Sequence, residues 1–316
     1  MKINIMCPKG AFGSLPYLAE LMKQIIGNSV TISGNNPKED YKPNYLNILI
    51  DEGISSVIYK RKADIWWTDT PAMLPNSYHK IDEILLNEQL FKKHYTVSEF
   101  NKQHYKELNI PVEDTIIPRP INPILFYYKT DYNKTEYDII TIGKHCICDR
   151  KNLRLQREVF LELNFKYCVV SDIWIPKRPN LTQFNFGSIT DELKAKLLSK
   201  SKFLLWTSFI EGFGLPVLEA MTVGTIPIYT DVPAHNEFAI GIPIKPEDKI
   251  KSCCYGVRII KYIITKEAIK EAVQYALSMN KEEYEDLQYK CMQKAVEIYN
   301  DFIDKLKLLI GGENAN

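Results

Sequence analysis

Short apolar runs alternate with amphipathic stretches along this chain of 316 residues. Residues 137–142 (YDIITI) and 203–206 (FLLW) are apolar runs of strand length, which are typical of strands buried on both faces of a parallel sheet. Residues 268–279 instead repeat apolar positions three and four apart, as an amphipathic helix does. Alternating strands and helices predict an α/β fold with doubly wound parallel sheets.

The most informative stretch is residues 203–228, which predict a strand, a loop, a short helix and a second strand. In the loop, Gly212 and Gly214 flank Phe213 and allow a sharp turn of the backbone. Pro216 suits the first turn of the helix, and Gly224 suits the position just past its end. These turn and helix-boundary residues place Glu211 in the loop and Glu219 about one turn into the helix.

Two carboxylates in these positions suit a nucleotide-sugar ligand. The amides at a helix start bind phosphate or diphosphate groups. Glu219, one turn inside, could accept two hydrogen bonds from the vicinal diol of a ribose, while Glu211 would reach the hydroxyls of a sugar. An ordinary strand-to-helix turn with two solvated glutamates explains the same pattern, and geometry alone leaves both interpretations open.

A resemblance favours the first interpretation. The segment from Glu211 to Leu215 (EGFGL), followed by Glu219 and Ala220, resembles the two-glutamate signature of retaining GT-B glycosyltransferases of family 4, the glycosyl transferases group 1. The resemblance is strong over residues 137–237, fair over 96–126 and thin at the N-terminus. It implies the GT-B fold, in which two Rossmann-like, doubly wound domains face a cleft.

The resemblance also implies the domain organisation. We expect an N-terminal, acceptor-side domain over residues 1–134 that is shorter than in typical relatives, and a C-terminal, donor-binding domain over residues 135–316. In relatives the last helix, here about 296–310, often folds back onto the first domain. The first domain usually selects the acceptor, so the acceptor stays unidentified.

The family's diphosphate clamp maps onto the stretch that follows residues 137–142. Lys144 matches the basic residue after Gly143, with lysine where arginine is commoner, and Lys151 matches the second basic position, with Arg150 as a substitute. A solvated basic loop is the alternative. Taken together, the expected catalytic residues are Glu211, Lys151 and Lys144, and the expected donor-binding residues are Gly13, Gly143, Arg150, Ile189, Gly212, Phe213, Gly214, Leu215 and Glu219.

Two of these positions belong to other loops. Gly13 ends a glycine-bearing loop (residues 8–13) that in the family approaches the donor, although a plain tight turn explains it as well. Ile189 follows a glycine-bearing segment whose backbone in the family reads the nucleotide base. On the acceptor side, Asp69 and His79 are candidates for acceptor contacts, and a polar surface loop explains both equally well.

The expected reaction is transfer of a sugar from a nucleotide-diphosphate donor to an unidentified acceptor with retention of anomeric configuration. The chain contains no Asp-x-Asp motif, so we expect no metal-bridged diphosphate, no metal site and no bound cofactor. Two other functions stay open: a sugar-nucleotide epimerase or phosphorylase with the same fold, and a degenerate subunit that only binds the donor.

The amino-acid composition limits the binding partners and the cellular compartment to be expected. Forty basic and thirty-nine acidic residues give a formal net charge of +1, which provides no argument for nucleic-acid binding. No apolar run approaches the length of a membrane span, so we expect a soluble or at most peripherally membrane-associated protein. Seven cysteines without a zinc-binding spacing are interpreted as reduced thiols of a cytoplasmic protein. The oligomeric state cannot be inferred.

Three weaker expectations concern the end of the first domain. Residues 85–93 are predicted to be helical, Ser98 to cap the following helix, and residues 115–126, with three prolines, to form a strand and a stiff extended connection. In the second domain, residues 174–184 are expected to be irregular.

Overall fold

The structure is a computed structural model. It describes residues 2–7, 15–27, 30–33, 41–52, 63–69, 90–107, 109–146, 148–254 and 257–311. The chain divides into two compact units. Unit 1 contains Met1–Pro120 and Asp301–Asn316, and unit 2 contains Ile121–Asn300. The predicted domain boundary at residue 134 stays a prediction.

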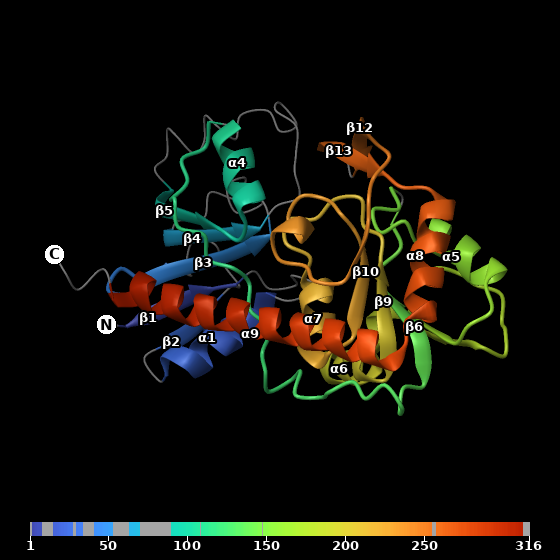
Figure 1. Ribbon diagram of the computed structural model, residues 1–316. Helices are drawn as coiled ribbons and strands as arrows, with labels where there is room; N and C mark the ends of the chain where they lie inside the picture. Colours follow the sequence, from blue (N-terminus) through green and yellow to red (C-terminus); the bar gives the residue numbers. More distant parts are fainter. Residues whose placement is uncertain are drawn as a thin grey trace. The chain divides into compact units, whose positions relative to one another are not determined.

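Unit 1 is built on a five-stranded parallel sheet in the order β2-β1-β3-β4-β5 (Figure 1). Its elements are β1 (Ile3–Met6), α1 (Leu15–Ile26), β2 (Val30–Ser33), β3 (Leu46–Glu52), β4 (Ala63–Asp69), β5 (Phe91–Thr96) and α4 (Glu99–Glu107). The central strands are buried as their apolar runs predict. The last turns of α9 (Lys281–Gly311) also belong to unit 1, where the ring of Phe302 stacks on Trp67 with centroids 5.8 Å apart.

Unit 2 contains a six-stranded parallel sheet in the order β11-β10-β9-β6-β7-β8. Its strands are β6 (Tyr137–Ile142), β7 (Tyr167–Val170), β8 (Leu181–Phe184), β9 (Ser201–Trp206), β10 (Ile226–Thr230) and β11 (Ile242–Ile244), with a separate hairpin of β12 (Asp248–Cys254) and β13 (Val257–Ile263). Its helices are α5 (Leu153–Glu162), α6 (Asp191–Ser199), α7 (Leu215–Val223), α8 (Lys266–Ser278) and the first part of α9. Figure 1 shows α5 and α8 on one side of this sheet and α6 and α7 on the other.

The strand order of unit 2 fixes where a ligand can bind. From β6 the chain builds outward through β7 and β8, then returns to the other side of β6 and builds outward through β9, β10 and β11. β6 and β9 are therefore neighbours whose connections leave in opposite directions. In open α/β sheets, ligands bind at the carboxyl ends of strands at such a reversal of strand order.

Several local predictions are confirmed. β6 spans the predicted residues, the backbone N–H of Asn101 donates to Ser98 Oγ at 3.1 Å as a helix cap should, and α7 ends at Gly224 with φ 79°. Three predictions are wrong. β5 begins at Phe91 inside the predicted helix, whose residues 85–89 lie outside the described residues, and β8 lies in a stretch expected to be irregular. Residues 115–126 contribute only an isolated bridge, between Thr96 and Ile116, rather than a strand.

Candidate functional site

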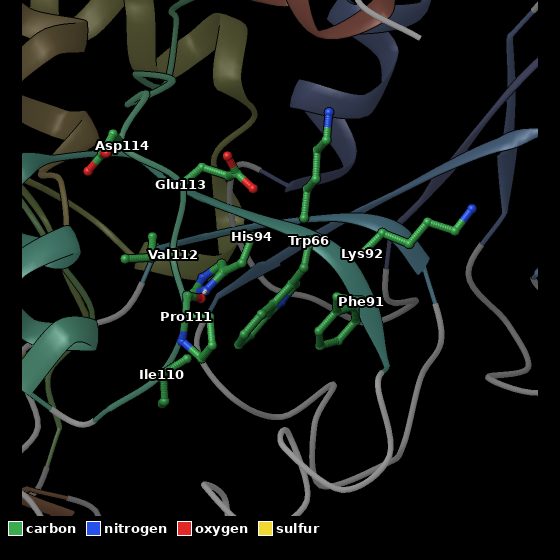
Figure 2. A pocket seen from close by; sticks show the side chains of 10 residues that line it. Trp66, Phe91, Lys92, His94, Ile110, Pro111, Val112, Glu113 and Asp114 are labelled. Carbon is green, nitrogen blue, oxygen red and sulfur yellow. Dashed lines mark hydrogen bonds between the residues drawn. The ribbon is translucent and has the colours of Figure 1, made fainter. Parts of the chain in front are cut away.

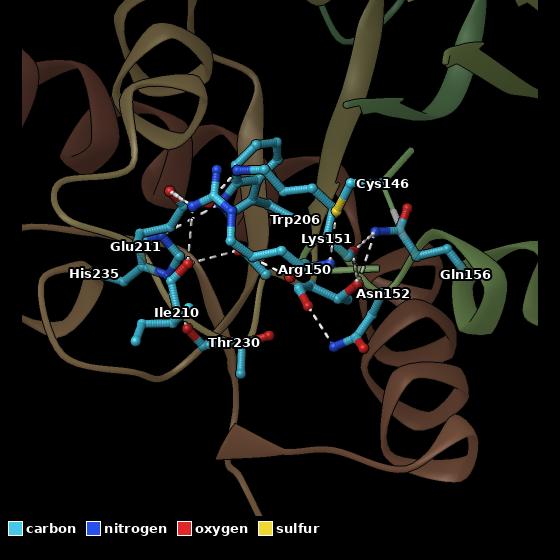
Figure 3. A network of polar contacts seen from close by, with 12 residues as sticks. Cys146, Arg150, Lys151, Asn152, Gln156, Trp206, Ile210, Glu211, Thr230 and His235 are labelled. Atoms are coloured by element: carbon cyan, nitrogen blue, oxygen red, sulfur yellow. Dashed lines mark hydrogen bonds and ion pairs between the residues drawn. The ribbon is translucent and has the colours of Figure 1, made fainter. Parts of the chain in front are cut away.

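Two loops meet at the carboxyl ends of β6 and β9 in unit 2. The first, after β6, carries Arg150 and Lys151, and the second, after β9, carries Glu211. Hydrogen bonds to backbone carbonyls join them: the N–H of Phe209 donates to the carbonyl oxygen of Arg150 at 3.0 Å, and the side-chain Oγ1 of Thr207 donates to that of Lys151, also at 3.0 Å. The two loops therefore hold their charged side chains in a fixed arrangement (Figure 3).

Glu211 is a buried carboxylate at the centre of a charge cluster. Arg150 Nη1 donates to Glu211 Oε2 at 2.7 Å, and Lys151 Nζ donates to the other carboxylate oxygen, Oε1. Burial alone would raise the pKa of Glu211, but the two cations outweigh burial and lower that pKa to about 2. Glu211 is therefore ionised, and both of its oxygens face basic side chains.

Lys151 lies between this carboxylate and an aromatic ring. Its Nζ is 3.8 Å from the centroid of the Trp206 ring, a cation–π contact at the end of β9. Gly143 lies against the lysine stem, since a Cβ at this glycine would be 3.4 Å from Lys151 Cγ, an ordinary van der Waals contact. Burial, and secondarily the charge of Arg150, lower the pKa of Lys151 to about 7 although Glu211 acts in the opposite direction.

Behind the cluster lies His235, a fully buried residue that orients Trp206. Its Nδ1 donates to the carbonyl oxygen of Thr230 at 3.0 Å, so its Nε2 accepts from Trp206 Nε1 at 3.3 Å. Burial lowers the pKa of His235, which is therefore neutral. Gly214 packs against this ring with φ +98°, and a Cβ at Gly214 would lie 2.5 Å from His235 Nε2.

The glycine loop leads directly into α7. Gly212 and Phe213 are buried, and the Phe213 ring stacks on Phe238 with centroids 4.7 Å apart. Leu215 begins the helix and is half-buried. The predicted sequence of loop, helix start and internal glutamate is thus present, with the left-handed turn at Gly214.

Glu219 of α7 is also buried and paired. Lys194 Nζ of α6 donates to Glu219 Oε1 at 2.6 Å and contacts Asp191 Oδ1 at 2.9 Å. The second oxygen, Glu219 Oε2, is buried and has no hydrogen-bond partner among the residues that the structure describes. Burial raises the pKa of Glu219 against the opposing charge of Lys194. One acceptor atom of this carboxylate is therefore unsatisfied within the described part of the chain.

The remaining predicted residues lie in different places. Ile189 is half-buried and extended, immediately before Thr190, whose Oγ1 caps α6 by accepting from Leu193 N at 3.1 Å. Lys144 is exposed directly after β6. Gly13 and His79 lie outside the described residues, and Asp69 is the last residue of β4 in unit 1.

Sequence reasoning missed Trp206, His235 and Lys194. Trp206 reads as one more apolar strand residue, and a single histidine has no motif. Lys194 lies one turn after the predicted capping residue Thr190, so its place on α6 could have been predicted from the sequence. Its contact with Glu219 of α7 is seen in the structure alone. The motif pattern thus predicts Arg150, Lys151, Glu211 and Glu219 but not Lys194, and the structure shows which side chains contact them.

In the described part of the chain, no three His, Cys, Asp or Glu side chains gather as a metal site requires, and no described helix is long and apolar enough to cross a bilayer. Cys148 is disulfide-bonded, so the interpretation of every cysteine as a reduced thiol is wrong at that position. Free thiols are found at Cys7, Cys146, Cys168, Cys253 and Cys291.

Part of the chain matches a known protein family. Residues 179–242, which include Glu211 and Glu219, match the family described as glycosyl transferases group 1. The chain is 28% identical over 271 residues to "Putative glycosyltransferase ORF330" of Acidianus filamentous virus 2 (isolate Italy/Pozzuoli), covering 78% of this chain and 79% of that protein.

Solved structures confirm the predicted fold. Sucrose-phosphate synthase from Thermosynechococcus elongatus superimposes with a TM-score of 0.68 at 12% identity, over 99% of this chain and 98% of that one. Anabaena HepE, solved in complex with UDP and glucose, gives a TM-score of 0.67 at 10% identity, over 100% and 99% of the two chains. The fold is GT-B, and the family match and the viral relative support a glycosyltransferase.

Proposed function

Starting from a GT-B fold and glycosyltransferase relatives, we propose that this protein transfers a sugar from a nucleotide-diphosphate donor to an acceptor with retention of anomeric configuration. The observation that carries the proposal is the pairing of both predicted glutamates, Glu211 and Glu219, which are buried, with half-buried cations in the same unit. A uridine nucleotide is the first donor to test, since the HepE neighbour was solved with UDP and glucose.

In this proposal, donor binding rearranges the cluster around Glu211. The diphosphate competes with the carboxylate for Arg150 and Lys151, which lie at the carboxyl ends of β6 and β9, where ligands of such sheets bind. Glu211, released from its cations, then accepts hydrogen bonds from hydroxyls of the transferred sugar. Charge balance supports this exchange, because two basic groups face a single carboxylate in the free protein.

The reaction itself breaks the bond between the anomeric carbon and the leaving phosphate oxygen. An acceptor hydroxyl oxygen forms the new bond on the same face of the sugar, and its proton passes to the departing diphosphate. Arg150 and Lys151 stabilise the charge that develops on the leaving oxygen, as preorganised groups do in electrostatic catalysis. Lys144 is assigned to the same diphosphate from the other end of its loop.

Glu219 is proposed to bind the ribose. Its Oε2, which is buried and lacks a partner, would accept from a ribose hydroxyl, while Lys194 holds Oε1. Ile189, which immediately precedes α6, would place its backbone near the base. We further propose that the fixed cations replace a divalent ion, so that turnover persists in the presence of EDTA.

The test combines a ligand screen with matched variants. UDP, GDP, ADP and their sugars should be compared for the rise in melting temperature that a ligand of the native state produces. Lys151→Ala should lower turnover on the order of 10² to 10³-fold without unfolding the protein. Lys290→Ala, which removes an exposed lysine paired with Asp286, is the control and should leave turnover unchanged.

A second pair separates binding from catalysis. Glu219→Gln should raise KM for the donor more than it lowers kcat, whereas Glu162→Gln, at a surface carboxylate paired with Lys266 and Lys270, should change neither. Absence of any stabilising nucleotide, or turnover of Lys151→Ala at the level of the unmodified protein, would contradict the proposal.

A further inference from the structure

The edge of the unit 2 sheet carries a groove that the proposed reaction does not use. The groove has a volume of about 540 Å³ and is lined by β8 and by the segment that joins β7 to β8, residues 171–180. β8 is an edge strand, and β7 separates it from β6, after which the loop of Arg150 and Lys151 follows. The groove is therefore separate from the proposed donor site. We call it the Trp174 groove, and its lining residues are Trp174, Ile175, Lys177, Arg178, Leu181 and Gln183.

The segment on one side of the groove is held in place by side-chain hydrogen bonds. Gln183 Nε2 of β8 donates to the carbonyl oxygen of Ile173 at 2.7 Å. Arg178 Nη1 donates to the carbonyl oxygen of Leu161, in α5, at 3.0 Å. These contacts order the segment before any ligand binds, which lowers the entropic cost of binding.

Trp174 presents its ring to solvent. It is 72% exposed, whereas the other three tryptophans of the chain are at most 3% exposed. A smaller cavity beside β5 in unit 1 shows the contrast, because the Trp66 indole there lies between the rings of Phe91 and His94 (Figure 2). Both faces of the Trp66 indole are covered by protein. Tryptophan is a highly buried residue on average, so an exposed indole in the lining of a groove indicates a surface on which a ligand packs.

Uncharged side chains complete the lining beside the indole. Ile175 is 4% exposed and Leu181 is half-buried, and both are aliphatic. Leu181 and Gln183 are two positions apart on β8, so their side chains lie on the same face of the strand. Gln183 uses its amide nitrogen for Ile173, and its Oε1 is a hydrogen-bond acceptor. A ligand in the groove thus meets an aromatic ring, two aliphatic side chains and an amide oxygen.

The charges of the lining have one sign. Lys177 and Arg178 are both exposed, and the described residues that line the groove include no Asp or Glu. Within the described part of the chain, neither cation pairs with a carboxylate. The Trp174 groove therefore attracts an anion, and the neutralising charge has to come from a ligand.

We propose that the Trp174 groove binds a saccharide that carries a carboxylate or a phosphate group. The apolar face of the sugar ring packs on the Trp174 indole, the anionic group pairs with Lys177 and Arg178, and a hydroxyl donates to Gln183 Oε1. Each hydroxyl can donate or accept, whereas a nucleobase edge needs a fixed set of donors and acceptors that this lining does not provide. The volume lies within the ordinary range of small-molecule sites, about 300–1,000 Å³. This site is independent of the proposed transfer reaction.

Indole resonances distinguish the groove from the proposed donor site. The four tryptophans give four indole N–H signals in a ¹H–¹⁵N spectrum, and the signals that disappear in Trp174→Phe and Trp206→Phe identify these two residues. The full chain is titrated with glucuronate and with glucose 1-phosphate. Glucose supplies the ring without the charge, and inorganic phosphate supplies the charge without the ring. Either anionic sugar should move the Trp174 signal, and glucose and phosphate should each bind on the order of tenfold more weakly.

Matched variants test the two kinds of contact, with binding followed by saturation-transfer NMR of the sugar. Trp174→Ala should weaken binding of glucuronate on the order of tenfold, because packing on the ring is lost. Lys177→Gln should weaken it by up to about fivefold, and less at high salt. Tyr275→Ala, which removes an aromatic ring 59% exposed on α8, is the control and should leave binding unchanged. All three variants should keep the melting temperature of the unmodified protein, since the replaced side chains are exposed.

Four outcomes overturn the proposal. They are a Trp174 signal that no sugar moves at millimolar concentration, equal affinity for glucuronate in Trp174→Ala and the unmodified protein, binding of phosphate or glucose as tight as that of both anionic sugars, and a larger shift of the Trp174 signal with UMP than with either anionic sugar. The last outcome would identify a nucleotide site. The nucleotide screen of the proposed donor site is read separately, since the Trp206 signal reports that site.

Discussion

At the scale of single residues, the most informative side chain is Lys151. Its ammonium contacts Glu211 on one side and the Trp206 ring on the other, in a buried position beside Arg150. This environment lowers the pKa of Lys151 to about 7, far below the ordinary value of a lysine. The lysine that we assign to the diphosphate therefore changes its charge within the physiological pH range.

A pH dependence of donor binding follows. The diphosphate brings negative charge and raises the pKa of Lys151, so above pH 7 the lysine takes up a proton when the donor binds. The affinity should fall as pH rises from 7 to 9, by up to about tenfold per unit. The pKa values of Glu211 and His235 are lowered, so neither group changes charge in this window.

Titration calorimetry with the best nucleotide sugar at pH 7, 8 and 9 measures this slope. The matched variant is Lys151→Arg, because arginine stays charged throughout the range. Its affinity should be independent of pH even if it is weaker overall. Equal slopes in the two proteins would show that another group takes up the proton.

The sequence predicted the ionic residues of the site better than the residues that support them. Glu211, Gly214 and Glu219 stand in one short pattern, and Arg150 and Lys151 follow a predicted strand, so resemblance could place them. Trp206 and His235 become partners only because β9 and the loop after β10 fold together. Such a contact leaves no local pattern in the chain.

At the scale of elements, the start of α7 depends on one glycine. Gly214 has φ +98°, which L-residues rarely adopt, and its missing Cβ makes room for His235. Gly214→Ala combines the backbone cost of about 1–2 kcal/mol with a steric cost of about 1–3 kcal/mol. We expect the free energy of unfolding to fall by about 2–5 kcal/mol, measured by urea denaturation.

The control for this substitution is Gly187→Ala in the same unit. A Cβ at Gly187 would approach no described atom closer than 3.9 Å, so Gly187→Ala should change the free energy of unfolding by no more than about 0.5 kcal/mol. If both variants were equally stable, the close packing of Gly214 on His235 would not be a feature of the protein in solution.

The start of β5, predicted as helix, and β8, predicted as irregular, were missed for the same physical reason. β5 and β8 are edge strands of their sheets, and their sequences, FKKHYT and LTQF, mix polar with apolar residues. Edge strands commonly carry charged residues, so their hydrophobic pattern is weak. The central strands β6 and β9 are buried on both faces, and their continuous apolar runs were recognised.

At the scale of the whole molecule, local patterns predicted that strands and helices alternate but not the order of the strands. The reversal beside β6, which brings the loops of Arg150 and Glu211 together, depends on which strands pair across more than sixty residues of chain. Resemblance to a known family supplied the fold, and the shared fold of the solved neighbours confirms it.

The last turns of α9 offer a test of which residues form unit 1. Residues from Asp301 onward belong to this unit, where Phe302 is 0% exposed and stacks on Trp67. Truncating a buried phenylalanine to alanine commonly costs about 3–5 kcal/mol, so Phe302→Ala should destabilise unit 1 by that amount. Leu308→Ala, on the same helix at a residue 71% exposed, is the control and should have little effect.

Thermal unfolding distinguishes the two units in this experiment. The unfolding transition whose midpoint temperature rises with nucleotide reports on unit 2, and the other transition reports on unit 1. Phe302→Ala should therefore lower the midpoint temperature of the unit 1 transition by more than that of the unit 2 transition. Because Phe302 is far along the chain from β4, this result would show that the first unit needs the C-terminal residues to complete its core. Equal melting curves for Phe302→Ala and Leu308→Ala would contradict the assignment of these residues to unit 1.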